Sequence, residues 1–268
     1  MSFVTLPKSS ASSAEGAAPA PAHLELRGVT HSYNGHAAVE AATLEVRSGE
    51  AVALVGPSGA GKTTLLRLMN GTLRPSVGTV VVDGRTLGDL SENELRRVRA
   101  HIGFIHQDLD LVPNLRVSQN VLAGKLGRLS FFQSLRAMLM PARADLELAH
   151  RILERVGIAE KLFERTDTLS GGEQQRVAIA RALFQEPTAL LADEPVSSVD
   201  PARARDTVAL LTSISRERGL TLVMSLHNLE LAREFFPRLI GLREGRILFD
   251  QAAAQVTDAQ FHQLYDLK

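Results

Sequence analysis

The sequence predicts an α/β protein in which short buried strands alternate with helices. Three observations support this fold class. The chain has 268 residues, of which 44% are hydrophobic and 22% charged, as in globular proteins large enough to bury a substantial core. Short apolar runs rich in branched side chains recur along it, separated by helix-like segments. A glycine-rich loop at residues 56–61 stands between one such run and a helix-like segment.

Composition excludes several classes of function. The chain has 30 Lys plus Arg and 30 Asp plus Glu, and this net charge of zero argues against a strongly basic nucleic-acid binder. Cysteine is absent, which rules out disulfides, thiolate metal sites and cysteine nucleophiles. No apolar run reaches the roughly 18 residues typical of a transmembrane helix, and the N-terminus lacks the pattern of a secretory signal. We therefore expect a cytosolic protein.

The first 22 residues differ from the rest of the chain. From Ser9 to Ala22 nearly all residues are Ala, Ser, Pro or Gly. Such a segment buries too little apolar area to offset the entropy lost on ordering. We predict a disordered tail over residues 1–22 and an ordered domain over residues 23–268.

The ordered domain is expected to begin with strands. Residues 24–33 alternate apolar and polar side chains, and a second strand-like run follows at 41–49. Residues 51–56 are continuously apolar, which suits a strand buried on both faces of a parallel sheet. The helix after the glycine-rich loop should end at Gly71, and residues 79–84 predict another strand.

The middle of the chain is predicted to be helical. Ser91 and Glu94 have the spacing of a capping box at the start of a helix over 91–99. From Asp108 to about Arg165 helical patterns dominate. Strand-like apolar runs then return at residues 188–193, 220–226 and 239–249.

The glycine-rich loop matches the phosphate-loop pattern at every position. Glycines let successive backbone N–H groups point at a phosphate, and the helix that follows adds the positive end of its dipole. Lys62 can reach the β and γ phosphates, the Thr63 hydroxyl can bind Mg²⁺, and Thr64 is placed for the α phosphate. The flanking strand and helix favour this over a structural turn. The predicted loop comprises Gly56, Pro57, Ser58, Gly59, Ala60, Gly61, Lys62 and Thr63.

Two adjacent carboxylates follow the apolar run at 189–192. In phosphate-loop ATPases a carboxylate at a strand end holds Mg²⁺, usually through water, and Asp193 is the candidate. Glu194 lies one residue further on, at the sheet edge where α/β proteins bind ligands, and could act as general base for the attacking water. Alone, Asp-Glu-Pro would indicate a solvated acidic turn. In a chain that also has a phosphate loop, it favours a catalytic role for the two carboxylates.

A third motif, LSGGE at residues 169–173, begins another helix. Ser170 and Glu173 can form a capping box, which by itself predicts only a well-capped helix. However, Gly171 and Gly172 in the first turn cost about 1 kcal/mol each relative to Ala. The close approach of a phosphate to bare backbone is one contact that would offset this cost.

Together the motifs resemble those of ATP-binding-cassette (ABC) ATPases. In chain order they are Tyr33, GPSGAGKT, Gln107, LSGGE, LLADEP, SSVD and His227. The resemblance extends from about His23 to the C-terminus, and LSGG upstream of LADEP is its most specific part. It implies a RecA-like phosphate-loop NTPase core with an N-terminal antiparallel β-subdomain. It also implies an inserted helical subdomain at about 108–165, with the signature helix continuing to about 186.

The same resemblance implies roles for the remaining motif residues. Tyr33 would stack on adenine, and Gln107 would reach Mg²⁺ and the attacking water. His227 would contact the γ phosphate as the switch histidine, and Asp200 would cross a dimer interface. The family forms head-to-tail homodimers, so ATP would lie between the phosphate loop of one subunit and Ser170, Gly171 and Gly172 of the other. Glu173 stands where many importers have Gln, and we expect its capping role to make it tolerated.

Three segments, 120–135, 191–201 and 220–250, are similar to those of the ATP-binding subunit of phosphonate importers. This implies an ATPase at the cytoplasmic face of the inner membrane, bound peripherally to permease subunits and served indirectly by an extracytoplasmic binding protein, with no nucleic-acid partner. The imported cargo would be a phosphonate or a related phosphorus oxyanion. The alternatives are the ATPase of an exporter or lipoprotein-release system, or a cassette acting on DNA or ribosomes.

The predicted helical subdomain contains apolar residues with two interpretations. Phe131, Phe132, Met138 and Met140 could be ordinary core residues. Alternatively, they could line a groove that holds a coupling helix of the permease. Different residues of the four could serve each purpose.

Overall fold

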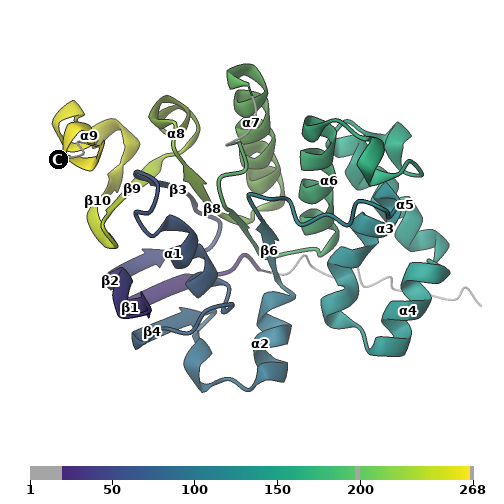
Figure 1. The fold of residues 1–268 in the computed structure, drawn as a ribbon, viewed down its shortest axis with the longest axis horizontal. Helices are drawn as coiled ribbons and strands as arrows, with labels where there is room; N and C mark the ends of the chain where they lie inside the picture. The colour runs from purple at the N-terminus through teal and green to yellow at the C-terminus, as the bar shows by residue number, and fades with distance from the viewer. Residues whose placement is uncertain (1–19, 197–199, 266–268) are drawn as a thin grey trace, which may run out of the picture.

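A computed structural model describes residues 20–196 and 200–265 (Figure 1). The predicted disordered tail, apart from residues 20–22, lies outside the described residues. Ala22 is already fully buried, and its N–H donates to the Thr188 carbonyl at 3.1 Å. The described contacts of the domain thus begin one residue before the predicted boundary at His23.

A four-stranded antiparallel sheet forms one part of the fold. Its strand order is β2 (His36–Val46), β1 (Leu24–Tyr33), β4 (Val77–Val82) and β5 (Arg85–Thr86). The strand predicted at 41–49 starts earlier, at His36, because β1 and β2 form a hairpin that pairs Tyr33 with His36. The connecting Asn34 and Gly35 both have positive φ, as a tight two-residue hairpin turn requires.

A six-stranded sheet carries the core. Its order is β10 (Arg246–Ala252), β9 (Arg238–Arg243), β3 (Ala51–Val55), β8 (Thr221–Leu226), β7 (Ala189–Ala192) and β6 (Ile102–Ile105). All neighbours are parallel except β9 and β10. The run at 239–249, predicted as one strand, is instead a hairpin, because Glu244 and Gly245 adopt positive φ and reverse the chain.

The helices of the described chain are short to medium in length. They are α1 (Lys62–Met69), α2 (Glu92–Arg99), α3 (Val117–Leu122), α4 (Phe131–Leu139), α5 (Arg143–Arg155), α6 (Gly171–Phe184), α7 (Pro201–Arg218), α8 (Leu229–Phe235) and α9 (Asp258–Tyr265). The predicted capping box of α2 is present, with the Ser91 N–H donating to Glu94 at 2.9 Å. None of the described helices is long and apolar enough to cross a membrane.

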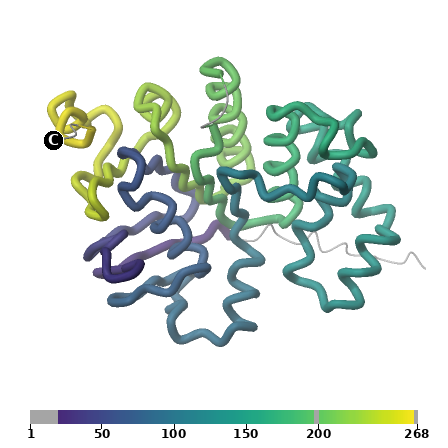
Figure 2. Tube along the Cα trace, viewed as in Figure 1, coloured from purple at the N-terminus to yellow at the C-terminus, as the bar shows by residue number. Residues whose placement is uncertain are grey.

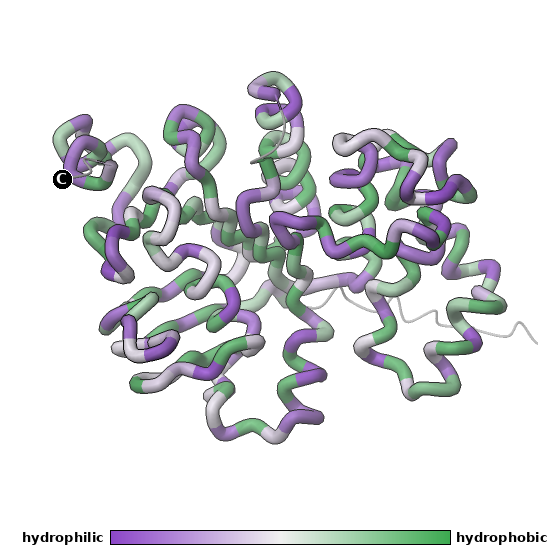
Figure 3. The backbone as a smooth tube through the Cα atoms, in the orientation of Figure 1, coloured by the Kyte–Doolittle hydropathy of each residue, from purple (hydrophilic) through white to green (hydrophobic). Residues whose placement is uncertain are grey.

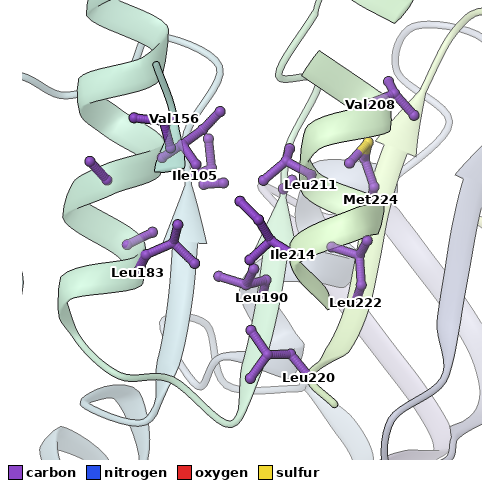
Figure 4. Close-up of a cluster of buried hydrophobic side chains, with 14 of the residues drawn as sticks. Ile105, Val156, Leu183, Leu190, Val208, Leu211, Ile214, Leu220, Leu222 and Met224 are labelled. Atoms are coloured by element: carbon purple, nitrogen blue, oxygen red, sulfur yellow. The ribbon is translucent and has the colours of Figure 1, made fainter. Parts of the chain in front are cut away.

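The central strands are buried between helices. Figure 3 shows hydrophobic residues along the middle of the molecule, and Figure 4 shows Leu183 and Leu211 directed toward strand residues Leu190 and Leu222. All four side chains are fully buried. Each contributes about 1.5–3 kcal/mol through removal of apolar surface from water. This packing fixes the carboxyl ends of β3, β7 and β8, from which the site residues follow.

Helices α3 to α6 form a group at one end of the molecule, beyond β6 (Figures 1 and 2). They connect β6 to β7, so the helical segment is inserted within the parallel sheet. The fold is therefore mixed α/β, with an antiparallel sheet, a mainly parallel sheet and an α-helical insertion, and is consistent with the predicted phosphate-loop NTPase class.

Candidate active site

The phosphate loop joins β3 to α1 and depends on two of its glycines. Gly56 has φ +152°, and a Cβ there would lie 2.1 Å from the Leu242 carbonyl oxygen. Gly61 has φ +100°, and a Cβ there would lie 2.3 Å from the Ala38 carbonyl oxygen. Both positions therefore exclude any side chain. Gly59 also has a positive φ, but a Cβ there would meet nothing within 4 Å, so this part of the loop faces open space.

Lys62, the first residue of α1, points back across the loop. Its side chain is buried, and Nζ donates to the carbonyls of Gly56 at 2.8 Å and Pro57 at 3.0 Å. Nζ also lies 3.4 Å from Glu194 Oε1. Burial lowers the pKa of Lys62, and the Glu194 carboxylate opposes this shift. The cation therefore has protein partners in this structure, and phosphates would have to compete for it.

Thr63 and Asp193 meet between α1 and the end of β7. Thr63 Oγ1 donates to Asp193 Oδ1 at 3.1 Å, and Asp193 is buried. These are oxygen donors of the kind that Mg²⁺ prefers. The described residues contain no group of three or more His, Asp or Glu side chains that could hold a metal. The pair therefore fits Mg²⁺ only if water and phosphate oxygens complete its coordination.

Glu194 occupies a strained backbone position beside Asp193. Its φ is 45°, a left-handed conformation that costs an ordinary residue roughly 1–3 kcal/mol. The side chain is 13% exposed, and Oε1 lies 2.6 Å from Nε2 of His227 as well as close to Lys62. His227 directly follows β8, as the sequence predicts. The structure thus brings Lys62, Thr63, Asp193, Glu194 and His227 together at one sheet edge.

Ser225 holds both carboxylate residues in place, and sequence analysis did not identify it. It is fully buried in β8; its Oγ donates to Asp193 Oδ1 at 2.9 Å and accepts from the Glu194 N–H at 2.8 Å. The only signal in the sequence was a hydroxyl near the end of a mainly apolar buried strand, which also begins with Thr221.

Tyr265 is a second residue that sequence analysis missed. It lies at the end of α9, and its hydroxyl donates to the His227 carbonyl at 3.2 Å. Burial raises the pKa of Tyr265, and a hydrogen bond with the backbone of Gly56 opposes this. The C-terminal helix therefore contacts both the phosphate loop and His227. No local pattern around residue 265 indicates this role, because the contact exists only in the folded chain.

Three other predicted residues lie around this group. Gln107 is exposed just after β6, the strand next to β7, and makes no hydrogen bond with a described residue. Tyr33 ends β1, is 43% exposed, and stacks edge-to-face on His31. Thr64 is buried within α1. The structure therefore leaves Gln107 and Tyr33 free to contact a ligand but does not bring them to Glu194.

The signature residues form a separate group. Ser170 caps α6, with its N–H donating to Glu173 at 2.8 Å. A Cβ on Gly171 would meet nothing within 4 Å, and one on Gly172 would lie 3.6 Å from the Arg203 guanidinium. Figure 1 shows α6 and α1 on opposite sides of β6. The chain thus presents its signature and its phosphate loop at different places.

Asp200 lies with the signature group. It caps α7, accepting from the Arg203 N–H at 3.1 Å, and its carboxylate pairs with the Arg203 guanidinium at 3.2 Å. Arg203 is the same side chain that approaches Gly172. Asp200 and the signature glycines are therefore neighbours, whereas SSVD residues 197–199 lie outside the described residues.

Comparison with known proteins identifies the family in which these motifs occur. The ABC transporter family model matches residues 39–197. The chain is 49% identical over 251 residues to the phosphonates import ATP-binding protein PhnC of Anaeromyxobacter dehalogenans, covering 94% of this chain and 49% of that protein. It is 47% identical over 235 residues to the PhnC of Pseudomonas fluorescens, covering 88% of each.

Solved structures of other cassettes are also similar to this chain. The dimeric bacterial ABC transporter cassette MJ0796 superposes with a TM-score of 0.77 at 31% identity, covering 86% of this chain and 98% of that one. The same cassette in a post-hydrolysis state bound to ADP and Pi gives a TM-score of 0.71 at 32% identity, with the same coverage of each chain. The cbiO1 protein of Clostridium perfringens gives 0.74 at 26% identity, covering 90% and 94%. The chain therefore belongs to the ABC transporter family as an ATP-hydrolysing cassette.

Proposed function

We propose that this chain is the ATPase subunit of an importer that carries a phosphonate or a related phosphorus oxyanion across the cytoplasmic membrane. The ATPase activity follows from family membership. The observation that supports its location in this chain is the convergence of Lys62, Asp193 and Glu194 at the carboxyl edge of the parallel sheet. The cargo is supported by the names of relatives 40–49% identical to this chain.

The residues divide the chemistry among them. Lys62, once released from its carbonyl partners, binds the β and γ phosphates of ATP, and the backbone N–H groups of the loop bind the remaining oxygens. Thr63, Asp193 and Gln107 hold Mg²⁺, which neutralises developing charge when bound. Glu194 accepts a proton from the attacking water. The water oxygen bonds to the γ phosphorus as the bond to the bridging oxygen breaks, and ADP and phosphate leave.

A second copy of the chain completes each site. The signature of one chain lies apart from its own phosphate loop, and the open backbone of Gly171 leaves room for a phosphate. In a head-to-tail dimer, Ser170, Gly171 and Gly172 would face the phosphates held by the partner, with Asp200 across the same interface. His227 would contact the γ phosphate and Tyr33 the adenine. The dimeric cassette of 31% identity supports this arrangement.

The importer role implies further partners. Permease subunits would hold the dimer at the cytoplasmic face of the membrane as a peripheral component, and an extracytoplasmic binding protein would deliver the cargo. No nucleic acid is part of this proposal. The chain would then convert closing and opening of the dimer into movement of the permease.

Uptake measurements test the function. Cells lacking this chain should lose uptake of labelled phosphonate, phosphite or phosphate, whichever is the cargo, and the wild-type chain should restore it. A chain carrying Glu194→Gln should be expressed equally and should not restore it. Normal uptake of all three anions without the chain, together with a defect in export or lipoprotein release, would contradict the importer assignment and favour an exporter.

A further inference from the structure

Helix α4 exposes most of its large apolar side chains. Phe131 is 75% exposed, Phe132 80% and Leu139 71%, and Met140, which follows the helix, is 76% exposed. None of the residues of α4 is buried. The interpretation of Phe131, Phe132 and Met140 as core residues is therefore wrong. Five of the ten large apolar residues exposed in the described part of the chain lie within 131–140, and such clustering marks an interaction surface.

The surroundings of α4 are basic. Residues 111–144 contain five Lys or Arg and no Asp or Glu, although the whole chain has 30 of each class. Arg136 lies on α4, is exposed, and forms no ion pair with a described residue. Arg143 begins α5, and its side chain is 94% exposed although it pairs with Glu147 at 2.8 Å. Arg136 is therefore a cation on the same helix as the apolar residues that remains open to an anionic partner.

A hollow of about 470 Å³ lies along the same helix. Its lining includes Leu129, Phe132, Arg136, Met140 and Asp145. Asp145 is the only carboxylate among its lining residues, and it lies 3.7 Å from Lys125 Nζ, which offsets its charge. The hollow thus combines an apolar lining with an uncompensated guanidinium, as a site for an acyl chain beneath an anionic headgroup would.

The size of the face favours a bilayer over a protein partner. Nine residues of helix extend about 14 Å, and one face of such a helix offers on the order of 200 Å². A stable protein interface buries about 800 Å² on each partner. A short helix with Phe and Leu on one face and Arg beside them instead matches helices that lie in the headgroup region of a bilayer.

We propose that α4 lies on the surface of an anionic lipid bilayer. Phe131, Phe132 and Leu139 enter the boundary between headgroups and acyl chains, and Arg136 sits at the level of the lipid phosphates. This contact is separate from any contact with a permease. A membrane location agrees with the proposed function, but binding of the purified chain to protein-free vesicles does not depend on it.

The absence of tryptophan from the chain permits a direct test. Phe131→Trp places a single tryptophan on α4, and Phe163→Trp places one at another exposed position, 61% exposed, outside residues 131–140. With vesicles of phosphatidylcholine and phosphatidylglycerol, emission from residue 131 should shift to shorter wavelength and be quenched by brominated acyl chains. Emission from residue 163 should not change. Equal behaviour of the two reporters would overturn the proposal.

Flotation of the full chain with the same vesicles measures how strongly the chain binds to them and which residues contribute to binding. Phe131→Ser with Phe132→Ser should weaken binding at least about tenfold, whereas Phe163→Ser should not, because only the former removes inserted apolar groups. Arg136→Gln should reduce binding to anionic vesicles and leave the weak binding to pure phosphatidylcholine unchanged.

Two results would reject the bilayer as the partner of α4. One is no association of the wild-type chain with anionic vesicles, even if purified permease then binds through Phe131 and Phe132. The other is vesicle binding that the double serine variant retains. ATP hydrolysis in solution should be normal in this variant, so a failed vesicle experiment leaves the proposed ATPase function standing.

Discussion

The Nε2 atom of His227 lies 2.6 Å from Oε1 of Glu194, and the same carboxylate oxygen lies 3.4 Å from Nζ of Lys62. The candidate base therefore lies between two groups that are themselves candidates for binding the γ phosphate. A bound γ phosphate would compete with Glu194 for both partners. We infer that nucleotide entry rearranges this triad and releases the carboxylate to accept a proton from water.

Glu194→Gln should reduce the rate of ATP hydrolysis at least about 100-fold, because the amide cannot act as a general base. ATP binding should be retained, since Lys62 loses only an anionic competitor. Steady-state phosphate release and calorimetry measure the two effects. Glu230→Gln is the matched control, because Glu230 lines the same cleft of about 560 Å³ yet forms no ion pair with Lys62. Normal turnover of the Glu194 variant would remove the residue from the role of base.

Lys62→Ala should weaken ATP binding by about 10- to 100-fold, the usual effect of losing hydrogen bonds from a charged donor. The variant also leaves the carbonyls of Gly56 and Pro57 without their buried partner, so a lower melting temperature is expected. Lys125→Ala removes a lysine from the helical insertion and should leave ATP affinity unchanged. Calorimetry measures the ATP affinity of each variant. Equal ATP affinity in wild type and Lys62→Ala would contradict the assignment of Lys62 as a phosphate-binding residue.

The residue positions in this site that were predicted correctly are determined by local sequence patterns. Asp193 and His227 follow apolar strands, so their place at the sheet edge follows from the strand pattern alone. The capping boxes at Ser91 and Ser170 likewise depend on four consecutive residues. In contrast, Tyr265 reaches His227 across 38 residues of sequence, and no periodicity encodes that contact.

Backbone conformation explains the other differences from prediction. The positive φ of Glu244 and Gly245 turns one apolar run into a hairpin. The sequence did not decide whether Phe131 and Phe132 are exposed, because apolar residues in a helical segment can either belong to a core or line a groove. Which face of a helix is covered depends on the position of its neighbours, and the neighbours of α4 among the described residues, including α3, leave Phe131 and Phe132 exposed.

Ser225→Ala should destabilise the protein by about 1–3 kcal/mol, because a buried hydroxyl with two partners is lost. It should also slow hydrolysis, since Asp193 and the Glu194 backbone lose the group that fixes them. Ser215→Ala is the matched control: Ser215 is equally buried, but its hydroxyl donates to the Leu220 carbonyl within α7 and its following turn. The temperature of thermal unfolding should fall in both variants, whereas the rate of ATP hydrolysis should fall only in Ser225→Ala. An equal loss of activity in both would reduce Ser225 to a structural role.

Tyr265→Phe should lower kcat several-fold with a smaller effect on the KM for ATP, because it removes the hydrogen bond to the His227 carbonyl as well as the one with the Gly56 backbone in the phosphate loop. The change keeps the ring, so thermal stability should fall by no more than about 1 kcal/mol. Tyr33 is the other of the two tyrosines in the chain, and Tyr33→Phe keeps its stacking surface and should match wild type in all three measurements. A rise in KM with unchanged kcat would contradict positioning through His227.

Gly172→Asp should separate nucleotide binding from dimer formation. A Cβ at this position meets only the Arg203 guanidinium at 3.6 Å and the backbone is not left-handed, so the fold should tolerate the change. In the Glu194→Gln background, ATP should drive the parent chain into a dimer on size-exclusion chromatography. The Gly172 variant should bind ATP with similar affinity and remain monomeric, since an aspartate would face the partner's phosphates.

Gly88→Asp supplies the control for that experiment. This substitution adds the same negative charge at a position where a Cβ meets nothing within 4 Å. Because residue 88 is far in sequence from the signature, dimerisation should persist. Hydrolysis at the wild-type rate by monomeric Gly172→Asp, with Glu194 intact, would show that one chain completes its own site. The separation of α6 from α1 across β6 argues against that result, because Gly172 and Lys62 belong to elements on opposite sides of the strand.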